Sequence, residues 1–265
     1  MRSAAQLARY QGLLWTLTSR ELKARYRGSV LGFFWSLVNP LLLLAVYSFV
    51  FGLVFESRVP GMEPYALFLI SGLFPWVWVS TAILEGTTAL TAHSALIKKA
   101  AFPASLLPLS SVVSNLVHFA LAVPILALAL AVGRLLGHEV GGWAGLLLPL
   151  VVALQVPMIA GLVLGLSALH AHFKDVRDLV SHLLTLLFFM TPILYSLDAI
   201  PIEAVRRAIV VNPFTPFTLG YQDVLFRGVV PEASLWAAMA AVSLVFWAAG
   251  AWIFGRLSET LVEAV

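Results

Sequence analysis

The chain has 265 residues, of which 61% are apolar and only 11% are charged, and its formal net charge is +3. A soluble domain of this length needs a polar shell, and a chain with a mean hydropathy of +0.96 has too few polar side chains to make one. The composition therefore excludes an ordinary soluble protein and indicates a membrane protein. Because the chain has no Cys, a disulfide, a thiolate metal site and a cysteine nucleophile are also excluded.

Residues 1–27 predict a cytoplasmic amphipathic helix. Apolar positions recur at helical spacing and basic residues gather toward the end of the segment; the apolar positions are Leu7, Tyr10, Leu14 and Leu17. Such a helix lies in the inner headgroup region, with its basic residues against anionic lipid. A short solvated helix that only obeys the positive-inside rule is the alternative.

Six later segments contain no Asp, Glu, Lys or Arg, and each is long enough, or nearly so, to span a bilayer core, which takes roughly 20 helical residues. They are residues 28–55, 64–84, 100–133, 140–173, 179–197 and 233–255. Stretches such as LAVPILALALAVG lack the alternation of a membrane β-barrel strand. The sequence therefore predicts an all-α polytopic membrane protein, with six transmembrane helices in a domain that covers residues 28–265.

The distribution of Lys and Arg orients these spans. With a cytoplasmic N-terminus, most of the 16 basic residues fall in inner segments, and those in outer segments are Arg58, Arg134, Arg206, Arg207 and Arg227. Because basic residues are enriched in cytoplasmic loops, both termini are expected to be cytoplasmic. Orientation accounts for the positive charge, so a nucleic-acid partner is not expected.

Residues 198–230, between the fifth and sixth spans, are too polar to span and too apolar for a solvated loop. Two short amphipathic pieces, residues 203–211 and 218–226, flank the motif NPFTPF. This composition favours two short helices on the outer face that dip into the membrane surface or are re-entrant. A packed external cap is the alternative.

Motifs for catalysis or nucleotide binding are absent. The chain has no G-x-x-x-x-G-K-[ST] loop and no G-x-S-x-G or H-E-x-x-H motif, and His170 and His172 lack a third ligand at a diagnostic spacing. We therefore expect no catalytic, cofactor-binding or metal-binding residues. Polar groups within the spans are scattered, and Glu85 is expected to pair with a basic residue or lie at the interface. A protein of this kind takes its energy from a partner.

A set of motifs in fixed order gives a resemblance. These are RELKARYRGSVLGFFWSLVNPLL, YALFLISGLFPWVWVS, ALIKKAAFP, FKDVRDLV, TPILYSLDAIP and VNPFTPF. Together they resemble the membrane subunits of type-2 ABC exporters that move lipid-linked polysaccharides, such as O-antigen and teichoic-acid exporters. The likeness covers nearly the whole chain, although the C-terminal RLSETLVEAV keeps only the outline of the family's tail.

The resemblance implies a homodimer of permease subunits that pairs with two copies of a cytosolic ABC ATPase, which holds the ATP and Mg²⁺. The N-terminal helix would be an interface helix. The coupling helix that contacts the ATPase would be Ala95, Leu96, Ile97, Lys98 and Lys99. The segment 198–230 would hold the outer gate, with Asn212, Pro213, Phe214 and Phe217.

In this family, spans one and five border a lateral gate for the lipid pyrophosphate head. The matching residues are Arg25, Arg27, Phe33, Trp35 and Tyr195, with the two arginines as phosphate contacts through charge-assisted hydrogen bonds. Lipid anchoring at the inner leaflet is the alternative for each arginine.

Several aromatic residues are candidates for lining a glycan channel. If the second span begins near Tyr65, Trp76 lies about 16 Å deep at 1.5 Å per residue, away from the interfaces where Trp is usual. The candidates are Phe34, Trp76, Trp78, Phe188 and Phe189. Packing or lipid contact is the alternative for each.

The sequence therefore predicts the permease subunit of an ATP-driven exporter of polyprenyl-pyrophosphate-linked polysaccharide in the cytoplasmic membrane of a bacterium. The rival interpretations are a type-2 ABC permease for drugs or lipids, and a stand-alone secondary transporter or membrane enzyme.

Overall fold

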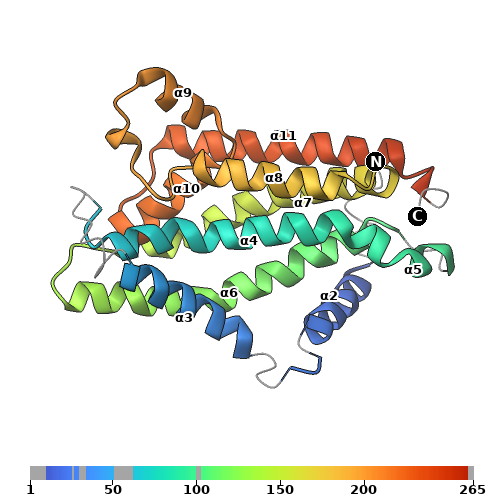
Figure 1. Cartoon of the computed structure of the whole chain (residues 1–265), viewed down its shortest axis with the longest axis horizontal. Coiled ribbons are helices and arrows are strands. Elements are labelled where there is room, and N and C mark those ends of the chain that lie inside the picture. Colours follow the sequence, from blue (N-terminus) through green and yellow to red (C-terminus); the bar gives the residue numbers. More distant parts are fainter. Residues whose placement is uncertain (1–9, 26, 30–33, 51–61, 100–102, 262–265) are drawn as a thin grey trace.

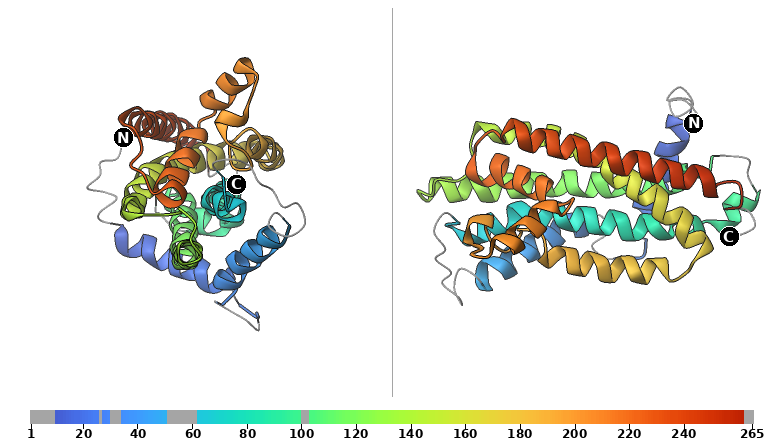
Figure 2. Two further views of the ribbon diagram at one scale, coloured as in Figure 1. Left: turned by 90° about the vertical axis from the view of Figure 1, so that its left-hand side faces the viewer. Right: turned by 90° about the horizontal axis from the view of Figure 1, so that it is seen from above.

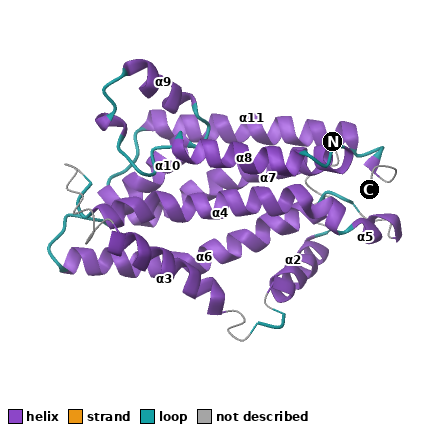
Figure 3. Cartoon of the chain, viewed as in Figure 1, coloured by secondary structure: helices purple, strands orange, loops and turns teal. Residues whose placement is uncertain are grey.

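A computed structural model of the protein describes residues 10–25, 27–29, 34–50, 62–99 and 103–261. All the regular elements in these ranges are helices, and none of the described residues forms a strand (Figure 3). The prediction of an all-α protein is confirmed for this part of the chain.

Within the described residues, four helices are long and apolar enough to cross a membrane. They are α4 (Tyr65–Ala92), α6 (Leu106–Leu135), α7 (Leu148–His172) and α11 (Ala233–Leu257), with the 3₁₀ turn η3 (Trp143–Leu147) leading into α7. They lie side by side along the long axis of the molecule (Figure 1). Four of the six predicted spans are thus found as long apolar helices.

The helices in the first and fifth predicted spans are shorter. Helix α3 (Trp35–Ser48) and helix α8 (Val176–Phe189) have 14 residues each. At 1.5 Å per residue each covers about 21 Å, short of a bilayer core of about 30 Å. Helix α8 ends shortly before Pro192, and a residue that precedes proline is disfavoured in helical conformation. The count of six spans stays a prediction.

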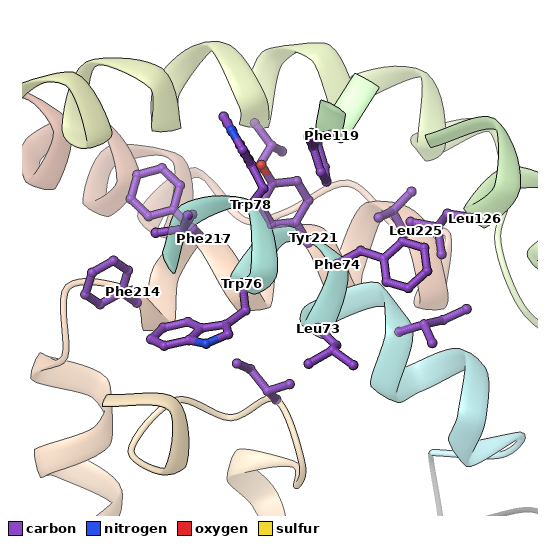
Figure 4. Packing of buried hydrophobic residues seen from close by; sticks show 14 of the residues in the cluster. Leu73, Phe74, Trp76, Trp78, Phe119, Leu126, Phe214, Phe217, Tyr221 and Leu225 are labelled. Atoms are coloured by element: carbon purple, nitrogen blue, oxygen red, sulfur yellow. The ribbon is translucent and has the colours of Figure 1, made fainter. Parts of the chain in front are cut away.

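Helix α4 is the centre of the bundle. In its most apolar 18-residue window, 78% of the residues are buried, against 17% for α11. It packs against α6 and α7, and its large side chains meet those of other helices in one hydrophobic cluster (Figure 4). The surface of α11 remains apolar, with Leu244, Val245 and Trp252 more than 60% exposed, as expected for a helix that faces lipid.

Helices α7 and α11 share the most extensive contact among the described elements. A Cβ atom built on Gly250 would lie 1.8 Å from the carbonyl oxygen of Gly161. Only glycine permits this approach of two backbones, and small residues at a crossing are how membrane helices come close together. The two glycines therefore fix the packing of α11 on the bundle.

The segment between α8 and α11 contains two helices with different surroundings. Helix α9 (Glu203–Val211) has the predicted bounds, projects from the bundle and is almost wholly exposed (Figures 1 and 2). Helix α10 (Thr215–Tyr221) and the π-helical turn η5 (Gln222–Arg227) are instead buried against α4, α7 and α11. The segment thus contains two short helices, but the second begins at Thr215 and packs within the bundle, and the placement of the pair as outer-face gate helices stays a prediction.

A second, smaller hydrophobic cluster lies at the other end of the molecule. It contains Leu90, Leu107 and Ala171, from the ends of α4, α6 and α7, and Leu261, which follows α11; Phe254 of α11 packs against it. Helix α2 (Gln11–Arg25) and helix α5 (Ser94–Lys99) pack against it through Leu17, Leu96 and Ile97. The end of α11 and the helix α5 therefore lie at the same end of the bundle, opposite α9 (Figure 1).

Candidate substrate cavity

A cavity of about 530 Å³ lies between α4 and α6 on one side and α2, Ser29 and α3 on the other. Figure 2 shows α2 and α3 along the outer side of the bundle. The residues that line the cavity are Arg25, Ser29, Trp35, Asn39, Leu43, Phe74, Val77, Trp78, Thr81, Asn115, His118, Phe119 and Ala122. It has a charged end and an apolar wall.

The charged end is built around an ion pair. The guanidinium of Arg25, the last residue of α2, donates to the carboxylate of Glu85 on α4. Asn115 on α6 donates from Nδ2 to the same carboxylate oxygen, Oε2 of Glu85, at 2.7 Å. The expectation that Glu85 pairs with a basic residue is confirmed. Three helices therefore meet at one carboxylate, because a charge this far along an apolar helix needs partners.

A second carboxylate of α2 lies nearby against α6. The hydroxyl of Ser110 donates to Oε1 of Glu21 at 3.2 Å, while the other oxygen, Oε2, is buried without a hydrogen-bond partner among the described residues. Burial raises the pKa of the Glu21 carboxyl, and the nearby hydroxyls of Ser114 and Ser110 only partly oppose this effect. Glu21 is therefore strained electrostatically when it is ionised.

Most of the apolar wall comes from α4 and α6, and α3 contributes Leu43. The rings of Trp78 and Phe119 are stacked with centroids 4.7 Å apart and planes at 15°. Both side chains are more than 95% buried in the protein, yet both contribute to the wall of the cavity, as do Phe74 and Leu43. The wall is thus rigid and suited to an apolar chain or to a ring that lies flat on it.

On the α3 side, the residues that border the cavity are more exposed to solvent than Trp78 and Phe119 are. The indole nitrogen of Trp35 donates to Oγ of Ser29 at 3.0 Å, and Trp35 is 37% exposed. Asn39, one turn along α3, is also exposed. The cavity is therefore bounded on this side by a short helix that packs lightly, rather than by the core.

The structure brings together two of the predicted lateral-gate residues. Arg25 and Trp35 both line the cavity, but Arg27 lies in an exposed turn and does not. Tyr195 lies outside the cavity as well, where its hydroxyl donates to the carbonyl oxygen of Phe189 at 2.8 Å. Phe33 is outside the described residues. The gate role of these residues stays a prediction.

The predicted channel aromatics lie in unlike surroundings. Trp76 is buried, with the ring centroids of Phe188 and Phe214 5.8 and 5.4 Å from its own. Figure 4 shows Trp76 beside Phe214. Trp78 lies on the opposite side of α4, stacked on Phe119. Trp78 also lines the cavity, and the channel-lining role of these aromatics stays a prediction. Phe34 and Phe189 are more than 60% exposed, and Phe188 is half-buried.

The predicted outer-gate residues are part of the core. Asn212 is 5% exposed and donates from Nδ2 to the carbonyl oxygen of Met190 at 3.0 Å and to Oγ1 of Thr191 at 2.9 Å. Its Oδ1 accepts from the backbone N–H of Phe214 at 3.0 Å. Phe214 and Phe217 are buried as well, whereas Pro213 is partly exposed. These contacts join the start of α10 firmly to the end of α8.

The predicted coupling segment forms a separate short helix, α5. Ala95 and Lys98 are exposed, while Leu96 and Ile97 pack on the small cluster at that end, and the helix ends at Lys99. The helix therefore presents one face to the surroundings and one to the bundle.

The sequence reasoning missed Asn39, Thr81 and Asn115, and it treated His118 as a scattered group. The missed signal was spacing. Trp78, Thr81 and Glu85 follow one another at three- and four-residue steps on α4, and Asn115 and His118 do so on α6. Such steps put side chains on one face of a helix, so two polar stripes on apolar helices indicated a shared site.

The four long apolar helices, their exposed apolar surface and the cavity beside them define a multi-pass membrane protein. Residues 12–226 match the family described as "ABC-2 type transporter", and the chain belongs to this family. It is therefore a membrane component of a transporter.

Relatives agree with this assignment over the full length. The chain is 39% identical to "O-antigen export system permease protein RfbA" of Myxococcus xanthus, with 100% of both chains covered. It is 33% identical to a protein of the same description from Klebsiella pneumoniae, with 95% of this chain and 94% of the relative covered. A second Klebsiella pneumoniae relative of that description is 35% identical over 82% of both chains.

Proposed function

We propose that the chain is the permease subunit of an ATP-driven exporter that moves polyprenyl-pyrophosphate-linked polysaccharide of the O-antigen type across the cytoplasmic membrane. Membership of the ABC-2 family favours an ATP-driven permease over a stand-alone secondary transporter or a membrane enzyme. The names of the relatives support O-antigen as the cargo.

One observation carries the proposal: the cavity is amphiphilic. At one end the guanidinium of Arg25 can bind phosphate oxygens through charge-assisted hydrogen bonds. The wall of Phe74, Trp78 and Phe119 is apolar and aromatic. A lipid pyrophosphate has the same division, with an anionic head joined to a hydrocarbon chain. Arg25 and Trp35 are therefore the gate residues that we retain from the sequence.

The energy comes from a partner in this proposal. The working unit has two copies of this chain and two copies of a cytosolic ABC ATPase, which carries the ATP and Mg²⁺. Helix α5 is its docking element, because Ala95 and Lys98 are exposed at the end where α11 also ends. Helix α2, within the cytoplasmic segment of residues 1–27, is the interface helix, residues 28–265 are the permease domain, and both termini are cytoplasmic.

The outer gate of the pathway lies in residues 198–230. Helix α9 is exposed and projects from the bundle, which suits an element that moves, while α10 is anchored in the core through Asn212 and its neighbours. We assign any movement in this segment to α9.

Export in a defined host tests the proposal. The chain and its ATPase are supplied to a bacterium whose own O-antigen permease gene is deleted, and surface O-antigen is measured with an antibody. We expect export to be restored by the native chain and reduced about tenfold or more by Arg25→Ala, because a hydrogen bond to a charged group contributes about 1.5–3 kcal/mol. The matched control is Arg134→Ala, which removes an exposed arginine at the far end of α6.

A permease for drugs or lipids is the alternative. It predicts that lipid-linked glycan export stays absent whichever variant is supplied, while the purified complex with the ATPase still moves a phospholipid or a drug when ATP is added. That outcome would replace the polysaccharide with another amphiphile and keep the family.

A further inference from the structure

Arg25, the arginine that we propose binds the substrate phosphate, is already paired with a carboxylate of this chain. Arg25 contacts the carboxylate of Glu85, and the side chains of Arg25 and Glu85 are 30% and 40% exposed. Arg25 and Asn115 line the cavity, and Glu85 lies directly behind them in contact with both, so a solute in the cavity can reach the ion pair at Arg25. It is the contact that joins the end of α2 to α4.

The carboxylate is held in place from a third helix. Asn115, which is 3% exposed, donates from Nδ2 to Glu85 at 2.7 Å and to the carbonyl oxygen of Ser111 at 2.9 Å. A buried amide that is fixed to its own helix has little freedom to turn away. Glu85 is thus presented to Arg25, and its position does not depend on Arg25 alone.

A carboxylate and a phosphate offer a guanidinium the same kind of partner, since both present anionic oxygens that accept its hydrogen bonds. We propose that Glu85 is the specificity-determining residue of the cavity: it takes the place of the substrate phosphate when the cavity is empty, and the substrate must displace it. This inference rests on the proposed function.

Displacement of Glu85 selects for charge. An uncharged amphiphile cannot compete for Arg25, and a lipid with one phosphodiester brings a single negative charge against the single charge of Glu85, so little is gained. A pyrophosphate brings at least two charges and more acceptor oxygens, so the exchange favours it. The pair therefore discriminates a lipid pyrophosphate from the surrounding phospholipid by a difference in affinity.

Displacement of Glu85 also removes one of the contacts that hold α2. When Arg25 binds the substrate in place of Glu85, the ion pair between α2 and α4 is lost. Helix α2 keeps its contact with α6 and with the small cluster at the α5 end of the bundle. Loss of the ion pair changes the contacts of α2, and α2 also packs at the end of the bundle where we place the ATPase. Substrate binding is therefore coupled to that end.

Binding to the purified complex of the full chain with its ATPase tests the inference. The probes are geranylgeranyl pyrophosphate and, as the single-phosphate lipid, phosphatidylglycerol, and the measured quantity is the Kd of each. We expect Glu85→Gln to bind the pyrophosphate about tenfold more tightly, which corresponds to about 1.4 kcal/mol, and to gain binding of phosphatidylglycerol. Asn115→Ala changes both in the same direction by a smaller factor. Asp178→Asn, which removes an exposed carboxylate from Arg177, changes neither.

Two results separate the inference from the function beneath it. If Glu85→Gln and Asn115→Ala bind both probes as the native chain does, or more weakly, while Arg25→Ala loses the pyrophosphate, then the role of Glu85 is overturned and the cavity keeps its function. If Arg25→Ala binds the pyrophosphate as well as the native chain does, the proposed site itself fails. Size-exclusion profiles check folding, and Asn115→Ala decides alone if Glu85→Gln does not fold.

Discussion

The two sides of α4 differ in the kind of contact that they make. On the side of α7 and α10, buried rings fill the space, and the polar groups are neutral and paired, as with the hydroxyl of Tyr221 and the amide of Gln155. On the side of α2 and α3 there is a cavity, and charged groups meet at Glu85. A neutral buried contact resists exchange, whereas a half-exposed ion pair admits a competitor. The side of α7 and α10, which we call the frame, therefore keeps its contacts, whereas a solute can bind on the side of α2 and α3.

The largest effect is expected from breaking the frame where α11 crosses α7. Gly250→Ala places a methyl group 1.8 Å from the carbonyl oxygen of Gly161, so the two helices must separate. We expect a loss of stability of about 3 kcal/mol, because over-packing between backbones cannot be relieved by a rotamer change. Thermal unfolding of the detergent-purified chain measures it.

Gly255→Ala is the control for this substitution. Gly255 lies on the same helix, and nothing lies within 4 Å of a Cβ built there. Its melting temperature should match that of the native chain or rise slightly, since alanine favours the helix. Equal losses in the two variants would show that α11 is not held through the glycine crossing.

A smaller effect is expected within the buried polar pairs of the frame. Tyr221 is fully buried, and its hydroxyl donates to Oε1 of Gln155 at 2.5 Å. Tyr221→Phe leaves that buried oxygen without this donor, which costs about 1–3 kcal/mol. The half-exposed Tyr195 supplies the comparison, because water can replace its bond to Phe189. A melting temperature that falls as far for Tyr195→Phe as for Tyr221→Phe would contradict the distinction between buried and half-exposed hydrogen bonds.

The smallest effect concerns Glu21, on the charged side. Its folded-state pKa is raised above the ordinary 4.5, chiefly by burial, so the folded chain binds the proton more tightly than the unfolded chain does. Its favourable contribution to stability is therefore complete below the ordinary pKa and is lost as the pH rises through the folded-state pKa.

Between about pH 5 and pH 8, the melting temperature of the native chain should therefore fall relative to that of Glu21→Gln. Glu259→Gln, at an exposed position near the end of α11, controls for the loss of one carboxylate. If the melting temperatures of the native chain and of Glu21→Gln change in parallel with pH, the carboxyl of Glu21 does not behave as a buried group.

Local signals in the sequence were enough for part of the fold. The bounds of α9 were predicted correctly, because Pro201 and the Asn212–Pro213 pair mark its two ends. The long apolar runs identified α4, α6, α7 and α11. The runs over the first and fifth spans predicted longer helices than the 14 residues of α3 and α8, since hydropathy does not register where a helix ends.

Burial of α10 could not be predicted in the same way. Its Thr, Pro and Gly content is typical of a surface segment, and the groups that satisfy the polar residues in and after α10 come from distant parts of the chain. Gln222 donates to the carbonyl oxygen of Pro192 at 2.7 Å, and Tyr221 reaches Gln155 on α7. A polar side chain is buried at little cost only when such partners are present, and one sequence does not reveal them.

The candidate site was predicted in part for the same reason. A carboxylate in an apolar helix needs a partner, so the pairing of Glu85 was foreseeable. The identity of the partner was not, because several basic residues lie at that end of the chain and only the fold brings Arg25 beside it.

The small cluster around Leu90 and Leu261 has a mechanical consequence. It joins six helices, α2, α4, α5, α6, α7 and α11, at one end of the molecule. A force applied to α5 through Leu96 and Ile97 is thus shared by all six instead of bending one of them. A movement imposed at that end would tilt the bundle as one rigid body. The largest displacement would then arise at the far end, beside α9.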